Sequence, residues 1–135
     1  MDKNISFKFD FIIYSKESNE FLDLDKFIFS MDVKNELLKE FCFTKTSNSW
    51  SIKSNRVYSF YLQESLRNFL DITKLNSCSP LLGYSEPDFE KRLFIKAEIF
   101  KDEIMPSFSL ELDILEFLHK HACTIDIDLY DYRKK

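Results

Sequence analysis

Three carboxylates near the C-terminus have a spacing that could support chemistry: Asp126, Asp128 and Asp131. On a β-strand, residues two apart project from the same face, about 6.6–7 Å from each other. Asp126 and Asp128 could bind a divalent cation or act as a general acid and base, with Asp131 or Glu98 as a further oxygen ligand. No sequence motif joins these residues. We therefore predict an acidic edge that faces solvent or a partner, with no metal or cofactor. A small metal-dependent hydrolase is the alternative.

A second cluster has the spacing His-x-His-x-Cys, at His119, His121 and Cys123. The preceding pattern is helical, and helical residues two apart point about 200° away from each other, so the two imidazoles cannot hold one zinc ion. Nothing nominates the oxyanion hole or third group that a Cys/His nucleophile pair requires. We predict a helix C-terminus, where an imidazolium meets the negative end of the helix dipole. Cys123 then begins a strand as a small hydrophobic residue.

Aromatic residues form the third pattern that could bind a ligand. Phe7, Phe9 and Phe11 alternate with polar residues, as stacking aromatic residues do in RNA-recognition strands. No Lys/Arg-Gly-Phe pattern accompanies them and the net charge is −4, so we predict a core-facing strand and no nucleic-acid partner. Trp50 is either a core anchor or an exposed contact residue, and we favour the core.

Negative charge is concentrated near the C-terminus. Residues 1–101 carry equal numbers of acidic and basic side chains, whereas residues 102–131 carry eight acidic residues and one basic residue, Lys120. A surface of this kind opposes nucleic acid, because binding phosphates requires clustered Lys and Arg. A solvated helix face and sheet edge would explain the pattern, and so would a basic protein partner.

Hydrophobic periodicity predicts the elements that must position these residues. In the first half, strict alternation predicts a strand at 5–13, and a weaker pattern predicts a turn of helix followed by a strand at 26–31. Asp32 is a plausible N-cap for a helix at 33–41, residues 44–49 read as a loop, and Trp50 begins a short strand.

The second half has clearer patterns. They predict a helix at 58–73, a loop at 76–88, a strand at 92–101, a helix capped by Ser107 or Ser109 and ending near His121, and a strand at 124–132. In the last helix we expect a core stripe of Leu112, Leu115 and Leu118, supported by Ile114 and Phe117. In the last strand we expect Ile125, Ile127 and Leu129 to point inward, opposite Asp126, Asp128 and Tyr130.

Together these elements predict one α+β domain over residues 1–135. We expect a single sheet with helices packed on one face, in a ferredoxin-like arrangement. The chain is 44% hydrophobic with one Gly and three Pro, which excludes a disordered or collagen-like protein. Three cysteines without paired spacing, no secretory signal and no long apolar run predict a cytoplasmic protein that does not enter a membrane.

The segment from Pro106 to Tyr130 resembles the C-terminal signature of the bacterial family catalogued as domain of unknown function 4279. That signature runs from a Pro through a Ser-Leu step and a Leu-repeat helix to a final Asp-Ile-Asp-Leu-Tyr strand. The positions that carry the resemblance are Pro106, Ser109, Leu115, Leu118, Asp126, Asp128 and Tyr130. The resemblance implies no catalytic residues. It implies an immunity role in bacterial polymorphic-toxin systems, exercised by binding.

The sequence therefore predicts a binding module rather than an enzyme. The expected partner is a protein, and a basic toxin domain would fit the acidic C-terminal segment. The candidate contact residues are Asp126, Asp128, Asp131, Tyr130, Tyr132 and Trp50. In this hypothesis the carboxylates attract the partner, while the aromatic residues supply the affinity.

Overall fold

The computed structural model describes residues 4–30, 41–101 and 108–133, which form an α+β fold with one mixed sheet. This confirms the predicted fold class. None of the described helices is long and apolar enough to cross a membrane. The elements in chain order are β1 (Ile5–Ser15), α1 (Leu22–Ser30), β2 (Phe41–Lys45), β3 (Ser49–Ser54), β4 (Val57–Tyr58), α3 (Leu62–Ile72), the 3-10 helices η1 (Leu75–Ser77) and η2 (Ser79–Gly83), β5 (Phe89–Ile99), α4 (Leu112–Lys120) and β6 (Cys123–Asp131).

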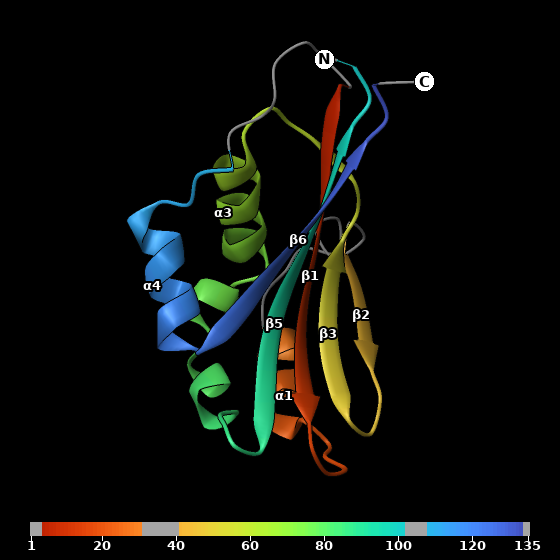
Figure 1. Cartoon of the computed structure of the whole chain (residues 1–135). Coiled ribbons are helices and arrows are strands. Elements are labelled where there is room, and N and C mark those ends of the chain that lie inside the picture. The colour runs from red at the N-terminus through yellow and green to blue at the C-terminus, as the bar shows by residue number, and fades with distance from the viewer. Residues whose placement is uncertain (1–3, 31–40, 102–107, 134–135) are drawn as a thin grey trace.

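The sheet has the strand order β2-β3-β1-β5-β6, with β4 beside one end of β1 (Figure 1). β1 and β5 pair antiparallel along their whole lengths, from Ile5 opposite Ile99 to Ser15 opposite Phe89. β6 runs parallel to β5, and α4 forms the crossover between them, as parallel neighbours require. A ferredoxin-like arrangement is not confirmed by this topology.

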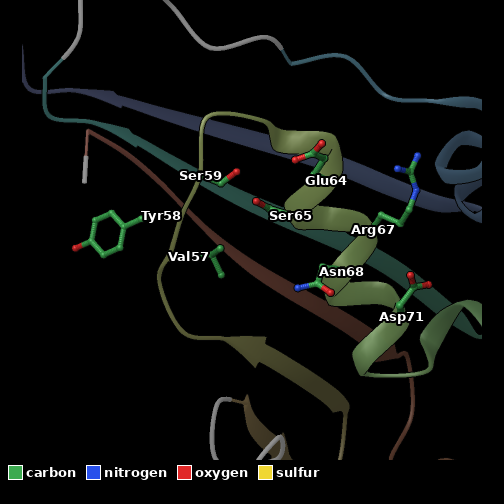
Figure 2. A pocket seen from close by; sticks show the side chains of 8 residues that line it. All are labelled: Val57, Tyr58, Ser59, Glu64, Ser65, Arg67, Asn68 and Asp71. Atoms are coloured by element: carbon green, nitrogen blue, oxygen red, sulfur yellow. The ribbon is translucent and has the colours of Figure 1, made fainter. Parts of the chain in front are cut away.

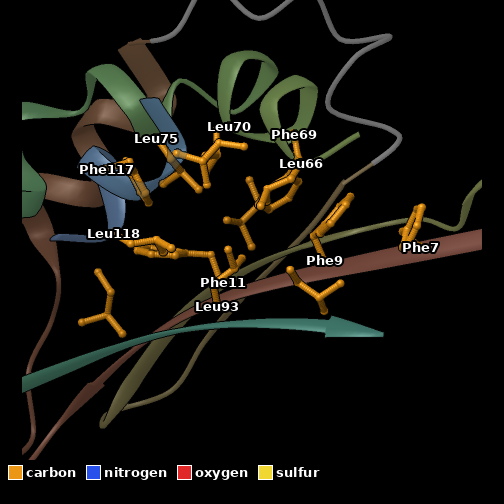
Figure 3. Close-up of a cluster of buried hydrophobic side chains, with 14 of the residues drawn as sticks. Phe7, Phe9, Phe11, Leu66, Phe69, Leu70, Leu75, Leu93, Phe117 and Leu118 are labelled. Carbon is orange, nitrogen blue, oxygen red and sulfur yellow. The ribbon is translucent and has the colours of Figure 1, made fainter. Parts of the chain in front are cut away.

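The core lies between the sheet and the helices on its covered face (Figure 3). Phe7, Phe9 and Phe11 project from β1 into it, and the ring centroids of Phe9 and Phe69 lie 5.4 Å apart. Each fully buried side chain of this size stabilises the fold by about 1.5–3 kcal/mol. The prediction of a core-facing aromatic strand is confirmed. So is the favoured interpretation of Trp50, which is buried on β3.

Two predictions in the first half are wrong and one cannot be compared. The strand predicted at 26–31 is wrong, because residues 26–30 belong to α1, whose first turn carries Asp23 and Asp25 at the positive end of the helix dipole. The loop predicted at 44–49 begins too early, because Thr44 and Lys45 pair with β3 and only three residues form the turn. The helix predicted at 33–41 falls outside the described residues, apart from Phe41, which begins β2.

The later elements are confirmed with different boundaries and faces. α3 begins at Leu62 rather than near Tyr58, which lies in β4 opposite Ser6. α4 begins after Glu111, so Ser109 is not its N-cap, and Ser107 falls outside the described residues. The core stripe of α4 consists of Ile114, Phe117 and Leu118, which point to the sheet, while Leu112 and Leu115 are exposed. The predicted core positions of Leu118, Ile114 and Phe117 are therefore confirmed, whereas those of Leu112 and Leu115 were wrong.

Candidate binding surface on the open face of the sheet

One face of the sheet carries no helix from the described segments, and we call it the open face (Figure 1). Its side chains alternate with the core residues of β1, β5 and β6, so the strand register places them together. Apart from buried Ser6 and Glu98, those in β1 and β5 are partly buried or exposed, whereas the odd-numbered residues from Ile5 to Ile13 and from Lys91 to Ile99 are buried. The open face includes Lys8, Asp10, Ile12, Tyr14, Arg92, Phe94, Lys96, Asp126, Asp128 and Tyr130.

Three aromatic rings stack in a row at one end of this face. The ring centroids of Phe100 and Tyr132 are 5.4 Å apart with planes 10° from parallel, and those of Tyr132 and Tyr130 are 6.4 Å apart at 12°. The Arg56 guanidinium lies 5.7 Å from the Phe100 centroid, and the Lys96 ammonium lies 4.9 Å from that of Tyr130. We call these five residues the aromatic column. Each cation–ring contact is of a kind worth about 0.5–1 kcal/mol at an exposed site.

Strand register and one buried carboxylate hold the aromatic column in place. Tyr130 lies opposite Glu98, and the Tyr132 amide donates to the Ile99 carbonyl over 2.8 Å. Glu98 is buried, accepts a hydrogen bond from the Ser6 hydroxyl at 3.3 Å and pairs with Arg56 at 3.0 Å. Because Glu98 fixes the guanidinium, it aims Arg56 at the column.

The aromatic column is better suited to a protein contact than to stacking with bases. Tyr132 lies between two other rings, and the register places Lys96 and Tyr132 on opposite sides of Tyr130 along the strands. Base stacking needs a free ring face. Tyr130 and Tyr132 nevertheless remain 42% and 37% exposed. Rigid, amphipathic Tyr side chains are typical anchors of protein interfaces.

The three candidate carboxylates do not converge. Asp126 lies on the open face and pairs with Arg92 at 3.1 Å. Asp131 lies opposite Ile99, whose side chain points to the covered face, and pairs with Arg133 at 2.8 Å. The described residues contain no group of three His, Cys, Asp or Glu side chains placed to hold a metal ion. Asp128 is exposed, and no ion pair links it to another described residue.

Arginines from other elements offset much of the acidic segment. Arg67 of α3 pairs with Asp113 at 2.8 Å and with Glu111 at 3.2 Å. The hydrogen bond from Arg67 lowers the pKa of the Asp113 carboxyl. Asp102 and Glu103 lie outside the described residues. The charge that looks continuous in the sequence is therefore divided among ion pairs on different surfaces, which leaves Asp128 as the contact carboxylate without such a pair.

The His-x-His-x-Cys cluster is structural in character. Burial, with the nearby charges of Lys91 and Lys120, lowers the pKa of His121 to about 4, so its imidazole is neutral at pH 7. The predicted helix C-terminus is confirmed, with His119 in the last turn of α4, but His121 packs with its ring centroid 4.8 Å from that of Phe117 instead of facing solvent. Burial also raises the pKa of the Cys123 thiol to about 12, which suits a hydrophobic residue and not a nucleophile. Cys123 begins β6 as predicted.

An open pocket of about 500 Å³ lies between β4 and α3 (Figure 2). Its polar side chains do not point to a common centre: Arg67 turns toward α4, where it binds Asp113, and Asp71 accepts a hydrogen bond from Asn76. An active site needs groups within reach of one reacting atom. This pocket does not provide that arrangement.

The structure brings together two of the six predicted contact residues, Tyr130 and Tyr132, and leaves Trp50 in the core. Asp126 and Asp128 lie on the same open face. Sequence reasoning missed Phe100, Lys96 and Arg56, together with Glu98 as a positioning residue. The available signal was the alternation predicted over 92–101, which places Lys96, Glu98 and Phe100 on one face. Using it required the pairing of β5 with β6 and the position of Arg56 beside Phe100.

Comparison with protein-family models, curated proteins and solved structures finds no match to this chain.

Proposed function

We propose that this chain is a non-enzymatic protein-binding module whose contact surface is the aromatic column together with Asp128. The observation that carries the proposal is an exposed, pre-stacked set of Tyr and cationic side chains on a sheet face without a described helix. Residues already fixed in their bound geometry lose little conformational entropy on association, which favours affinity. Trp50 is not part of this surface, because it is buried.

The resemblance to domain of unknown function 4279 supports a specific version of this proposal, in which the chain is an immunity protein that neutralises a toxin. A basic toxin surface would complement Asp128, and Asp126 could exchange its pairing with Arg92 for a contact with the partner. Such charges act mainly on the association rate and on specificity. The aromatic column would supply most of the affinity.

A site-specific cross-linking experiment tests the proposal. Tyr130 is replaced by the photoreactive residue p-benzoylphenylalanine, and the purified chain is irradiated in an extract of the source organism. The matched control carries the same residue at Tyr61, which is also exposed but lies just before α3. We expect one protein to be captured at position 130, absent at position 61 and displaced by an excess of the unmodified chain.

Two results would contradict the proposal. One is capture of the same proteins at both positions, which would indicate non-specific contact. The other is that no protein is captured when the photoreactive residue replaces Tyr130, and none when it replaces Tyr132. An adduct with a small metabolite at position 130, detected by mass spectrometry of the intact chain, would favour a different class of ligand.

A further inference from the structure

β6 is an edge strand, and its outer side is paired with no other described strand. The strand order ends at β6, and among the described strands its only partner is β5, along all positions from Cys123 to Asp131. In a strand the backbone N–H and C=O groups point alternately to its two sides, so half of those of β6 point away from the sheet. Edges of this kind are templates for pairing with another chain.

β6 lacks several devices that commonly protect an edge. Such edges are short, or they carry Pro, a bulge or charged side chains, of which β6 has carboxylates alone. β6 has nine residues, against five in β2 at the opposite edge, and its sequence contains no Pro, Lys or Gly. Its pairing with β5 is continuous and contains no bulge. An additional strand could therefore pair along most of its length.

The side chains of β6 present a different chemistry on each face of the sheet. On the covered face, Ile127 and Leu129 are 39% and 45% exposed. On the open face, Asp126 and Asp128 precede Tyr130. A strand that pairs with β6 must therefore alternate, with apolar residues beside Ile127 and Leu129 and other residues beside the two carboxylates.

Charge excludes a second copy of this chain as the favoured occupant. An antiparallel register that places Ile127 opposite Ile127 of the second copy also places Asp126 opposite Asp128, twice. Shifting the register so that Ile127 meets Ile125 or Leu129 places Asp126 or Asp128 opposite itself. Like charges directly opposite each other destabilise a strand pair. Each of these three registers is therefore penalised in a homodimer and favoured with a basic strand.

We propose that β6 binds an extended segment of another protein as an additional strand, and that this segment alternates Lys or Arg with aliphatic residues. The inference rests on the proposed binding function and specifies its partner. Backbone hydrogen bonds along β6 hold the segment, the aliphatic residues cover Ile127 and Leu129, and the basic residues meet Asp126 and Asp128. This is the strand-addition mode of peptide recognition.

Synthetic peptides test this inference on the full chain. The probe has nine residues of alternating Lys and Val, matching the length of β6, with blocked termini. One control alternates Glu and Val, and a second has the Lys–Val composition in two blocks. NMR titration should show shifts and slowed amide exchange centred on β6 with the Lys–Val peptide. The Glu–Val peptide should bind at least about fivefold more weakly, since repulsion replaces attraction at two cross-strand positions.

A charge reversal provides a sharper test with a matched control. Asp128→Lys should weaken binding of the Lys–Val peptide and strengthen binding of the Glu–Val peptide. Glu116→Lys changes the net charge equally but lies exposed on α4, and it should change neither affinity. Two further peptides carry N-methyl groups on one or the other set of alternate residues. Only one of them should lose binding, because only one set of amides faces β6.

The outcomes separate this inference from the proposed function. Equal binding of the Lys–Val and Glu–Val peptides, equal effects of Asp128→Lys and Glu116→Lys, or insensitivity to both N-methyl patterns would overturn strand addition. No binding of the Lys–Val peptide would overturn it too. If a partner is nevertheless captured through Tyr130, the binding function stands and uses the aromatic column alone. If the peptide binds but no partner is captured through Tyr130, strand addition at β6 stands and the proposal that the aromatic column binds a protein fails.

Discussion

β5 and β6 have the same alternating pattern and lie side by side in parallel, but their aliphatic residues differ in burial. The aliphatic face of β5 is buried from Leu93 to Ile99. The corresponding face of β6 is increasingly exposed, from half-buried Ile125 to Ile127 and Leu129. The difference comes from position in the sheet, because β5 has a neighbour on each side and β6 has one. Alternation thus determines which face a residue takes, while its burial depends on what lies beside the strand.

The largest expected effect tests that contrast with one substitution on each strand. Ile95→Ala should lower the free energy of unfolding by about 2–5 kcal/mol, because Ile95 is fully buried and the truncation leaves a cavity. Ile127→Ala, directly opposite on β6, should cost less than about 1 kcal/mol, because part of the side chain is already in water. Urea unfolding of both variants measures the difference. Equal losses would show that β6 is part of the core.

Acid should lower the free energy of unfolding through His121, which is buried. Its folded pKa of about 4 lies below the unfolded value of about 6.5, so the unfolded chain binds more protons between these values. Stability is therefore fully present above pH 6.5 and falls as the pH drops toward 4, by at most about 3 kcal/mol. His121→Leu should remove this part of the pH dependence, measured by unfolding at pH 7 and pH 5. His119→Gln, at an exposed position of α4, should retain it.

A smaller effect is expected on the open face. Tyr130→Ala should lower the free energy of unfolding by about 0.5–1.5 kcal/mol, the range for one aromatic pair, because the ring is exposed and contacts only Tyr132 and Lys96 among the rings and cations described. Thermal unfolding followed by circular dichroism measures it. A loss as large as that of Ile95→Ala would mean that the aromatic column is structural and not a contact surface.

No effect is expected from metal ions. Calorimetric titration with Mg²⁺, Mn²⁺, Ca²⁺ and Zn²⁺ should show no sub-millimolar binding, because Asp131 points to the face opposite Asp126 and Asp128. Binding that disappears in Asp128→Asn would support the metal-dependent hydrolase instead. Such binding would also favour a catalytic role for the open face of β6 over a role in binding a partner.

For β1, β5 and β6 the sequence was sufficient to predict the strand and the face that each residue takes. Alternation in β1, β5 and β6 is strict, and it placed Phe9 and Ile95 in the core correctly. The pattern around residues 26–31 was ambiguous, since aromatic and aliphatic residues there fit either period, and the helical period is the observed one. β2 was missed as a strand because Thr44 and Lys45 are polar. Its pairing with β3 is seen only in the folded structure.

The candidate site could be predicted only in part from the sequence. Tyr130 and Tyr132 were identified because they lie at the end of the acidic strand predicted at 124–132. The neighbours that make them a surface come from β5, from Phe100 just after it and from the segment before β4. Finding Phe100 and Arg56 requires the register of strands that are far apart in the chain. The acidic segment was misleading for the same reason, since Arg67 and Arg92 reach it from other elements.

The most direct test of the account measures the affinity of the captured partner for column variants. The double substitution Tyr130→Ala and Tyr132→Ala should raise the Kd by at least ~30-fold, since truncating interface anchors typically costs 2 kcal/mol or more. Tyr61→Ala, at an exposed aromatic residue before α3, should leave the Kd within about twofold. An unchanged Kd in the folded double variant would contradict the claim that the open face of β5 and β6 is the binding surface.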